Sequence, residues 1–199
     1  MTRPIVDQPA EERDTMQIDR NAAGHPHRTG APRAASDRLA GLVHGAATVC
    51  MGLIAGLFFD WAVAIMPALA DSDDRTFVIV MQKTIAAMNN GPLFLLTLMG
   101  AFVFTGVAAI LQYRLGARPV ARWILAALVL YVVAIMITAA VHFPLNFALE
   151  NAGDPDTIAD IAALRQDVEG SWMSAHVIRT IATIGALACL CRSLWLRRG

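Results

Sequence analysis

The sequence predicts an all-α fold, a membrane four-helix bundle with up-down-up-down topology. Its 199 residues are 56% hydrophobic and only 16% charged, against about 25% charged residues in soluble domains. The apolar residues also gather into four segments separated by polar loops. Each segment is long enough to cross a hydrocarbon core about 30 Å thick, which takes roughly 20 helical residues.

The predicted spans cover residues 39–66, 92–111, 123–143 and 172–194. The second follows an amphipathic stretch, TFVIVMQKTIAAMNN, which can lie at the membrane surface or extend the helix outward. The third span is followed by Pro144, which lacks a backbone donor and is expected to kink or end the helix. Short connections between the spans favour an antiparallel bundle.

The first 37 residues differ in kind from the rest of the chain. Residues 1–37 carry many charges of both signs and few large apolar side chains, a composition that cannot bury a core. We therefore predict two parts, a disordered cytoplasmic tail at residues 1–37 and a four-transmembrane-helix domain at 38–199.

Arginines mark one side of the predicted bundle. They precede the first span, join the second to the third, and follow the fourth: Arg33, Arg38, Arg114, Arg118, Arg122, Arg192, Arg197 and Arg198. The loop after the third span instead carries six acidic residues and one arginine. Because basic residues near span ends stay in the cytoplasm, we predict a multi-pass protein of the plasma (inner) membrane with both termini cytoplasmic.

This orientation makes a direct prediction for reporter fusions. Alkaline phosphatase, which folds only outside the cytoplasm, should be active when fused after Ala152 and inactive when fused after Gly116. The reverse pattern of activities would overturn the predicted orientation.

Polar residues from all four spans are expected at similar depth in the outer leaflet. They are Asp60, Asn89, Asn90, His142, Asn146, His176 and Arg179. Ionisable groups inside spans usually face the bundle interior or a water-filled cavity. On the last span, Glu169, Trp172, His176 and Arg179 share one helical stripe, and Asp60 or Glu169 is the expected partner if Arg179 forms an ion pair. We therefore predict a pocket open to the outer leaflet; His44, near the inner end, is expected at the interface without a role.

Four stretches of the chain resemble a known family. They are AGLFFDWAVAIMPAL, MQKTIAAMNNGPLF, HFPLNFAL and WMSAHVIRT. In this order they are similar to the anthrone oxygenase-like family of small four-span membrane proteins, over roughly Gly41 to Leu194. The resemblance implies oxidation of a hydrophobic phenolic or polyketide-like substrate with dioxygen and without an established cofactor. The chain differs from the family's usual pattern at His142 and His176, where asparagine is more common.

The first functional hypothesis is a cofactor-independent monooxygenase. His176 or His142 would act as the base, and Arg179 would stabilise the enolate oxygen that forms when the substrate loses a proton. Substrate binding would fall to Asn146, Trp172, Asp60 and Asn89. The partners of such an enzyme are the lipid bilayer and a hydrophobic small molecule, with self-association into a homo-oligomer left open. The balance of sixteen basic and sixteen acidic residues argues against nucleic acid as a partner.

Two other hypotheses stand beside it. A metal or haem site would use His142, His176, Asp60 and Glu169 as ligands for iron, copper, zinc or haem. A non-enzymatic subunit would bind lipid or quinone, with the polar residues serving only to hold the bundle together. The metal content of the purified protein separates the first two hypotheses.

Overall fold

A computed structural model describes residues 30–198 of the chain. None of these residues lies in a strand, which confirms the all-α prediction. Residues 1–29 of the predicted tail lie outside the described residues, and positions 30–37 form the start of the first helix. Residues 37–198 belong to one compact unit, and the following description concerns that unit.

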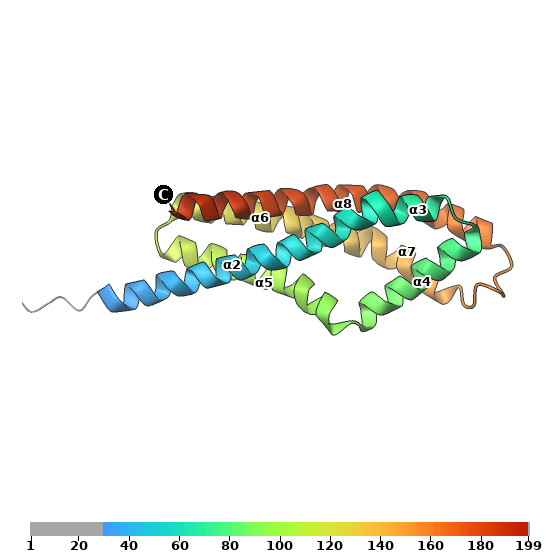
Figure 1. Ribbon diagram of the computed structural model, residues 1–199, viewed down its shortest axis with the longest axis horizontal. Helices are drawn as coiled ribbons and strands as arrows, with labels where there is room; N and C mark the ends of the chain where they lie inside the picture. The colour runs from blue at the N-terminus through green and yellow to red at the C-terminus, as the bar shows by residue number, and fades with distance from the viewer. Residues whose placement is uncertain (1–29, 199) are drawn as a thin grey trace, which may run out of the picture. The chain divides into compact units, whose positions relative to one another are not determined.

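The helices run in the order shown in Figure 1. They are α2 (Gly30–Asp60), η1 (Trp61–Ile65), α3 (Met66–Ala70), α4 (Asp74–Asn90), α5 (Pro92–Arg114), α6 (Arg118–Ile137), η2 (Thr138–His142), α7 (Phe143–Asn151) and α8 (Ile161–Arg198). Four continuous stretches are long and apolar enough to cross a membrane: Ala34–Ala70, Pro92–Arg114, Arg118–Asn151 and Ile161–Arg198. The prediction of four membrane helices is therefore confirmed.

Three of these stretches are much longer than the predicted spans. The fourth begins eleven residues before Trp172, because Ile161–Ser171 continues the same helix. Charged and polar side chains end a hydrophobic segment, but they do not interrupt the hydrogen bonds of the helical backbone. The apolar pattern therefore predicts the length of the segment in lipid, which is shorter than the whole helix.

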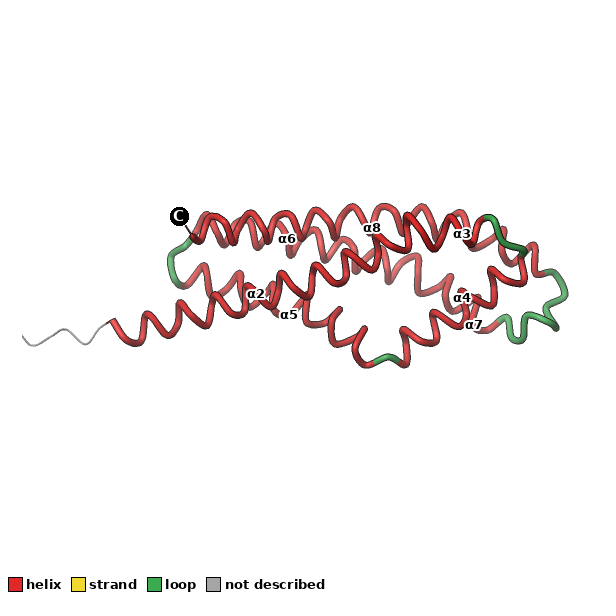
Figure 2. The backbone as a smooth tube through the Cα atoms, viewed as in Figure 1, coloured by secondary structure: helices red, strands yellow, loops and turns green. Residues whose placement is uncertain are grey.

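Small side chains fill the core where α2, α5, α6 and α8 meet. Ala47, Ala101, Ala108, Ala127 and Ala186 are fully buried there. Alanine lets membrane helices approach closely, so that dispersion contacts replace a hydrophobic driving force that lipid does not provide. A short loop after Arg114 joins the end of α5 to the start of α6 (Figure 2).

The amphipathic stretch before the second span folds as a separate helix, α4. It meets α5 at Gly91, where a Cβ atom would lie only 2.7 Å from the carbonyl oxygen of Ala87. Figure 1 shows α4 and α5 diverging from this point like the arms of a V. Phe77, Met81 and Ile85 of α4 are buried in a second core with residues of α7 and α8. The stretch therefore forms a wall of the bundle.

Two helices each contain one π turn, with hydrogen bonds spanning five residues, just before a proline. The backbone N–H of Met66 bonds to the carbonyl of Trp61, and that of Phe143 bonds to the carbonyl of Thr138, each five residues back. Proline follows at the next position in both helices. A proline ring clashes with the carbonyl four residues earlier, and a π turn relieves this clash. The helix therefore continues past Pro144 to Asn151, rather than ending there.

Arg165 fixes the start of α8 to the end of α3. Its guanidinium donates to the carbonyls of Leu69, Ala70 and Ser72 and to the carboxylates of Asp74 and Glu169. A helix leaves its last carbonyls without partners, so a cation at this point satisfies several acceptors at once. The contacts of Arg165 therefore give it a structural role, which is to hold α3 and α8 together.

The loop between α7 and α8 is tied to α4 by polar contacts. Arg75 Nε lies 2.5 Å from Asp156 Oδ1, and Gln82 Nε2 donates to the carbonyls of Leu149 and Gly153. The hydrogen bond from Arg75 lowers the pKa of the Asp156 carboxyl below its usual value. This exposed contact therefore contributes to folding stability at pH values above the ordinary pKa of the carboxyl. The contribution is lost as the pH falls through the lowered pKa of the folded state.

Candidate active site

A small cavity lies at the end of the bundle where the two π turns face α8. Its volume is about 80 Å³. Residues of seven helical segments line it: Phe58, Trp61, Met81, Thr84, Ile85, Met88, Asn89, Phe94, Thr138, His142, Phe143, Asn146, Trp172, His176 and Arg179. The structure thus brings six of the seven site residues of the monooxygenase hypothesis to one cavity, and Asp60 is the exception.

Arg179 is the charged group of this cavity. Only 7% of the residue is exposed, and its guanidinium lies 4.1 Å above the centre of the Phe58 ring. One terminal nitrogen donates to Thr138 Oγ1 at 3.3 Å and the other to His176 Nδ1 at 2.7 Å. Its Nε is buried without a hydrogen-bond partner among the described residues. No carboxylate of residues 30–198 forms an ion pair with it.

The contacts of His176 determine which of its nitrogens carries the proton. A guanidinium only donates hydrogen bonds, so Nδ1, 2.7 Å from Arg179, must be the acceptor. The other nitrogen, Nε2, lies 2.9 Å from the carbonyl oxygen of Phe58 and must donate. His176 is therefore a neutral imidazole with both nitrogens engaged. It holds Arg179 in place and has no lone pair left for a substrate.

His142, unlike His176, has ring nitrogens that are not held by neighbouring groups. It lies in the π turn of the third span and is only 1% exposed. Neither of its ring nitrogens makes a well-formed hydrogen bond with the described residues. The ring packs edge-on against Trp172, with centroids 5.0 Å apart, and lies 6.2 Å from the His176 ring. A histidine that lines a cavity with an unengaged lone pair can accept a proton from a ligand there.

Trp172 joins the two histidines into one aromatic group. Its ring stacks on His176 with centroids 4.8 Å apart and an interplanar angle of 15°. Its indole N–H donates to Asn146 Oδ1 at 3.0 Å, and the centroid of the Trp61 ring lies 5.6 Å from that of Trp172. The position of Trp172 is therefore fixed by both stacking and a hydrogen bond, which makes it a rigid wall for a flat ligand.

The acids predicted near Arg179 lie elsewhere. Glu169 pairs with Arg165 at 2.8 Å, and Asp60 is exposed and does not line the cavity. Asn89 lines the cavity and also donates to Glu150 at 3.1 Å. Within residues 30–198, no three side chains of histidine, cysteine, aspartate or glutamate meet in a cluster suited to a metal ion.

Three further contributors escaped the sequence reasoning. The ring of Phe58 lies under the guanidinium of Arg179, and the carbonyl of Phe58 accepts a hydrogen bond from His176. The hydroxyl of Thr138 accepts a hydrogen bond from Arg179. Trp61 lies against Trp172. Trp61 begins one π turn, Phe58 lies three residues before it, and Thr138 begins the other π turn. The repeated spacing of a proline two residues after each π turn was the available signal, since π turns are frequent at functional sites.

Comparison with known proteins finds a family similarity within this helical domain. A family model described as anthrone oxygenase matches residues 93–189. These residues are similar to the anthrone oxygenase family. The matched segment contains Thr138, His142, Asn146, Trp172 and Arg179, and with them most of the polar side chains of the cavity. No curated protein and no solved structure matches the chain.

Proposed function

We propose that the protein is an anthrone oxygenase-like oxidoreductase that binds a hydrophobic phenolic or polyketide-like compound as its anion. The substrate would enter from the membrane and react with dioxygen in the cavity at Arg179. One observation carries this proposal: a buried arginine that forms no ion pair with any carboxylate of residues 30–198. A buried cation costs several kcal/mol unless it is paired or hydrated, so the site is built to receive an anion.

The proposed reaction begins with a proton transfer. A methylene group between two aromatic rings, conjugated through them with a carbonyl across the central ring, loses a proton to His142, which has an unengaged nitrogen. The negative charge moves onto the carbonyl oxygen as an enolate, which Arg179 stabilises by a charge-assisted hydrogen bond. Because Arg179 Nε is already buried without a partner among the described residues, this bond requires no competing contact to break.

The carbanion then reacts with dioxygen. A new C–O bond forms, and protonation gives a hydroperoxide. Loss of water from that hydroperoxide breaks the O–O bond and the remaining C–H bond and leaves a second carbonyl. One oxygen atom of dioxygen thus enters the product, the other leaves as water, and the methylene carbon is oxidised from CH₂ to C=O.

The cavity must enlarge to hold such a substrate. A volume of about 80 Å³ corresponds to a few water molecules, each of which occupies about 30 Å³ in the liquid. Met81 and Met88 line the cavity beside Ile85 on α4. Methionine side chains rearrange easily, and α4 joins α5 through the bend at Gly91. We therefore infer that the α4 wall yields when the substrate binds.

Oxygen-isotope labelling tests the proposal. Protein purified in detergent should convert an anthrone to the corresponding quinone under ¹⁸O₂, with one labelled atom in each product molecule and one dioxygen consumed. Binding of the anthrone without any turnover would favour the non-enzymatic alternative. Turnover that depends on stoichiometric iron, copper or zinc, lost together with both histidines, would favour the metal hypothesis instead.

A further inference from the structure

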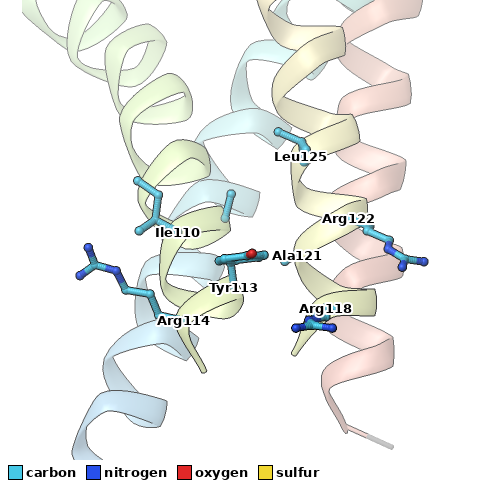
Figure 3. Close-up of a pocket in the computed structure, with 8 residues that line it drawn as sticks. Ile110, Tyr113, Arg114, Arg118, Ala121, Arg122 and Leu125 are labelled. Atoms are coloured by element: carbon cyan, nitrogen blue, oxygen red, sulfur yellow. The ribbon is translucent and has the colours of Figure 1, made fainter. Parts of the chain in front are cut away.

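A second cavity lies at the other end of the bundle, between α5 and α6. Its volume is about 550 Å³, and it is lined by Ala109, Ile110, Tyr113, Arg114, Arg118, Ala121, Arg122 and Leu125. Figure 3 shows Tyr113 reaching from α5 toward Ala121 on α6, with Arg118 at the start of α6. Arg114 and Arg122 extend outward on the two sides. We call this cavity the α5–α6 groove.

The groove combines three cations with an apolar wall. No acid in the described part of the chain forms an ion pair with Arg114, Arg118 or Arg122. The first turn of α6 also begins without a side-chain cap, so the positive end of its dipole adds to the same field. Ile110 and Leu125 are more than half exposed and present aliphatic surface beside these charges.

The charged and apolar parts are separated along the bundle axis. Leu125 lies seven residues beyond Arg118 on α6, a rise of about 10 Å in a helix. Ile110 lies one turn from Arg114 on α5. The interfacial layer of a bilayer is several ångströms thick on each side of the hydrocarbon core. A lipid phosphate at the arginines would therefore place the start of an acyl chain against Ile110 and Leu125.

We infer that the α5–α6 groove is a binding site for one anionic phospholipid of the surrounding bilayer. Arg118 and Tyr113 contact the phosphate, Arg114 and Arg122 on the two sides add positive charge, and the aliphatic wall contacts an acyl chain. Guanidinium groups bind phosphate oxygens through paired hydrogen bonds, and basic clefts between membrane helices bind anionic headgroups. A soluble anion would satisfy the arginines but leave the apolar wall uncovered. This site lies apart from the cavity at Arg179 and does not depend on the proposed reaction.

Lipid titration with native mass spectrometry tests this inference. The purified full-length chain is titrated with phosphatidylglycerol and with phosphatidylcholine of the same acyl chains. We expect phosphatidylglycerol to be retained preferentially. In the double variant Arg118→Gln/Arg122→Gln its affinity should fall roughly 10- to 30-fold, since each basic residue near an anionic headgroup contributes about a factor of five.

A matched control separates the groove from net charge. Arg192→Gln/Arg198→Gln removes two charges from the same end of the bundle, on α8 and outside the groove, and should leave the affinity unchanged. Leu125→Trp keeps every arginine but fills the apolar part, and should block the lipid. Equal retention of the two lipids, or an equal loss in both double variants, would overturn the inference. So would displacement of the lipid by inorganic phosphate, which would identify a soluble-anion site.

Discussion

Replacing Arg179 by glutamine is expected to lower kcat strongly and to leave the protein at least as thermally stable as the wild type. Loss of a single preorganised donor to an oxyanion costs about 10²- to 10³-fold in kcat. Burial of a cation without a carboxylate is itself unfavourable, so removal of the charge offsets the loss of the bonds to His176 and Thr138. Arg179→Lys should also impair turnover, because an ammonium lacks the planar fork of guanidinium.

Arg165→Gln is the matched control, since both arginines lie on α8. The guanidinium of Arg165 binds three carbonyls and two carboxylates, so its loss leaves several acceptors without a partner. We expect a lower melting temperature and normal activity per folded molecule. Thermal unfolding and oxygen uptake of both variants give the comparison. A strong loss of stability in Arg179→Gln would mean that this arginine holds the fold together and would contradict its role in substrate binding.

Much of the fold could be predicted because lipid imposes a simple rule on sequence. A span needs about 20 apolar residues, and polar residues inside it must face other protein or water. Helical periodicity then places Trp172, His176 and Arg179 on one stripe, and the structure does bring these residues to one cavity. These conclusions rest on local spacing alone, which a sequence displays directly.

Features that depend on contacts between helices could not be predicted in this way. The sequence suggested Asp60 or Glu169 as the counter-charge of Arg179, but Glu169 is engaged by Arg165, which looked like an isolated loop residue. His44 was expected at the interface, but it is fully buried and lies 2.7 Å from Ser193 on α8. Spacing along one helix says how residues align on that helix, but it does not say which residue of another helix faces them.

Replacing His142 and replacing His176 are expected to have different effects on turnover and on ligand binding. His142→Gln removes the only unengaged imidazole of the cavity among the described residues and should lower kcat about 10²- to 10⁴-fold, the usual contribution of a general base. Binding of a phenolic product analogue should be unchanged, because Arg179 keeps its contacts. His176→Phe preserves the ring that stacks on Trp172 but removes the acceptor that holds Arg179. We expect weaker binding of the analogue together with slower turnover.

Chemical rescue distinguishes a base from a group that only positions another. In His142→Gly, added imidazole can occupy the space of the lost ring and accept the substrate proton, so it should restore part of the activity. In His176→Gly, a free imidazole would have to bind the carbonyl of Phe58 and Arg179 at the same time, and the orientation of Arg179 would still be lost. Rescue of His176→Gly but not of His142→Gly would reverse the two roles, because the lone pair on His176 Nδ1 would then have to be available to the substrate rather than committed to Arg179.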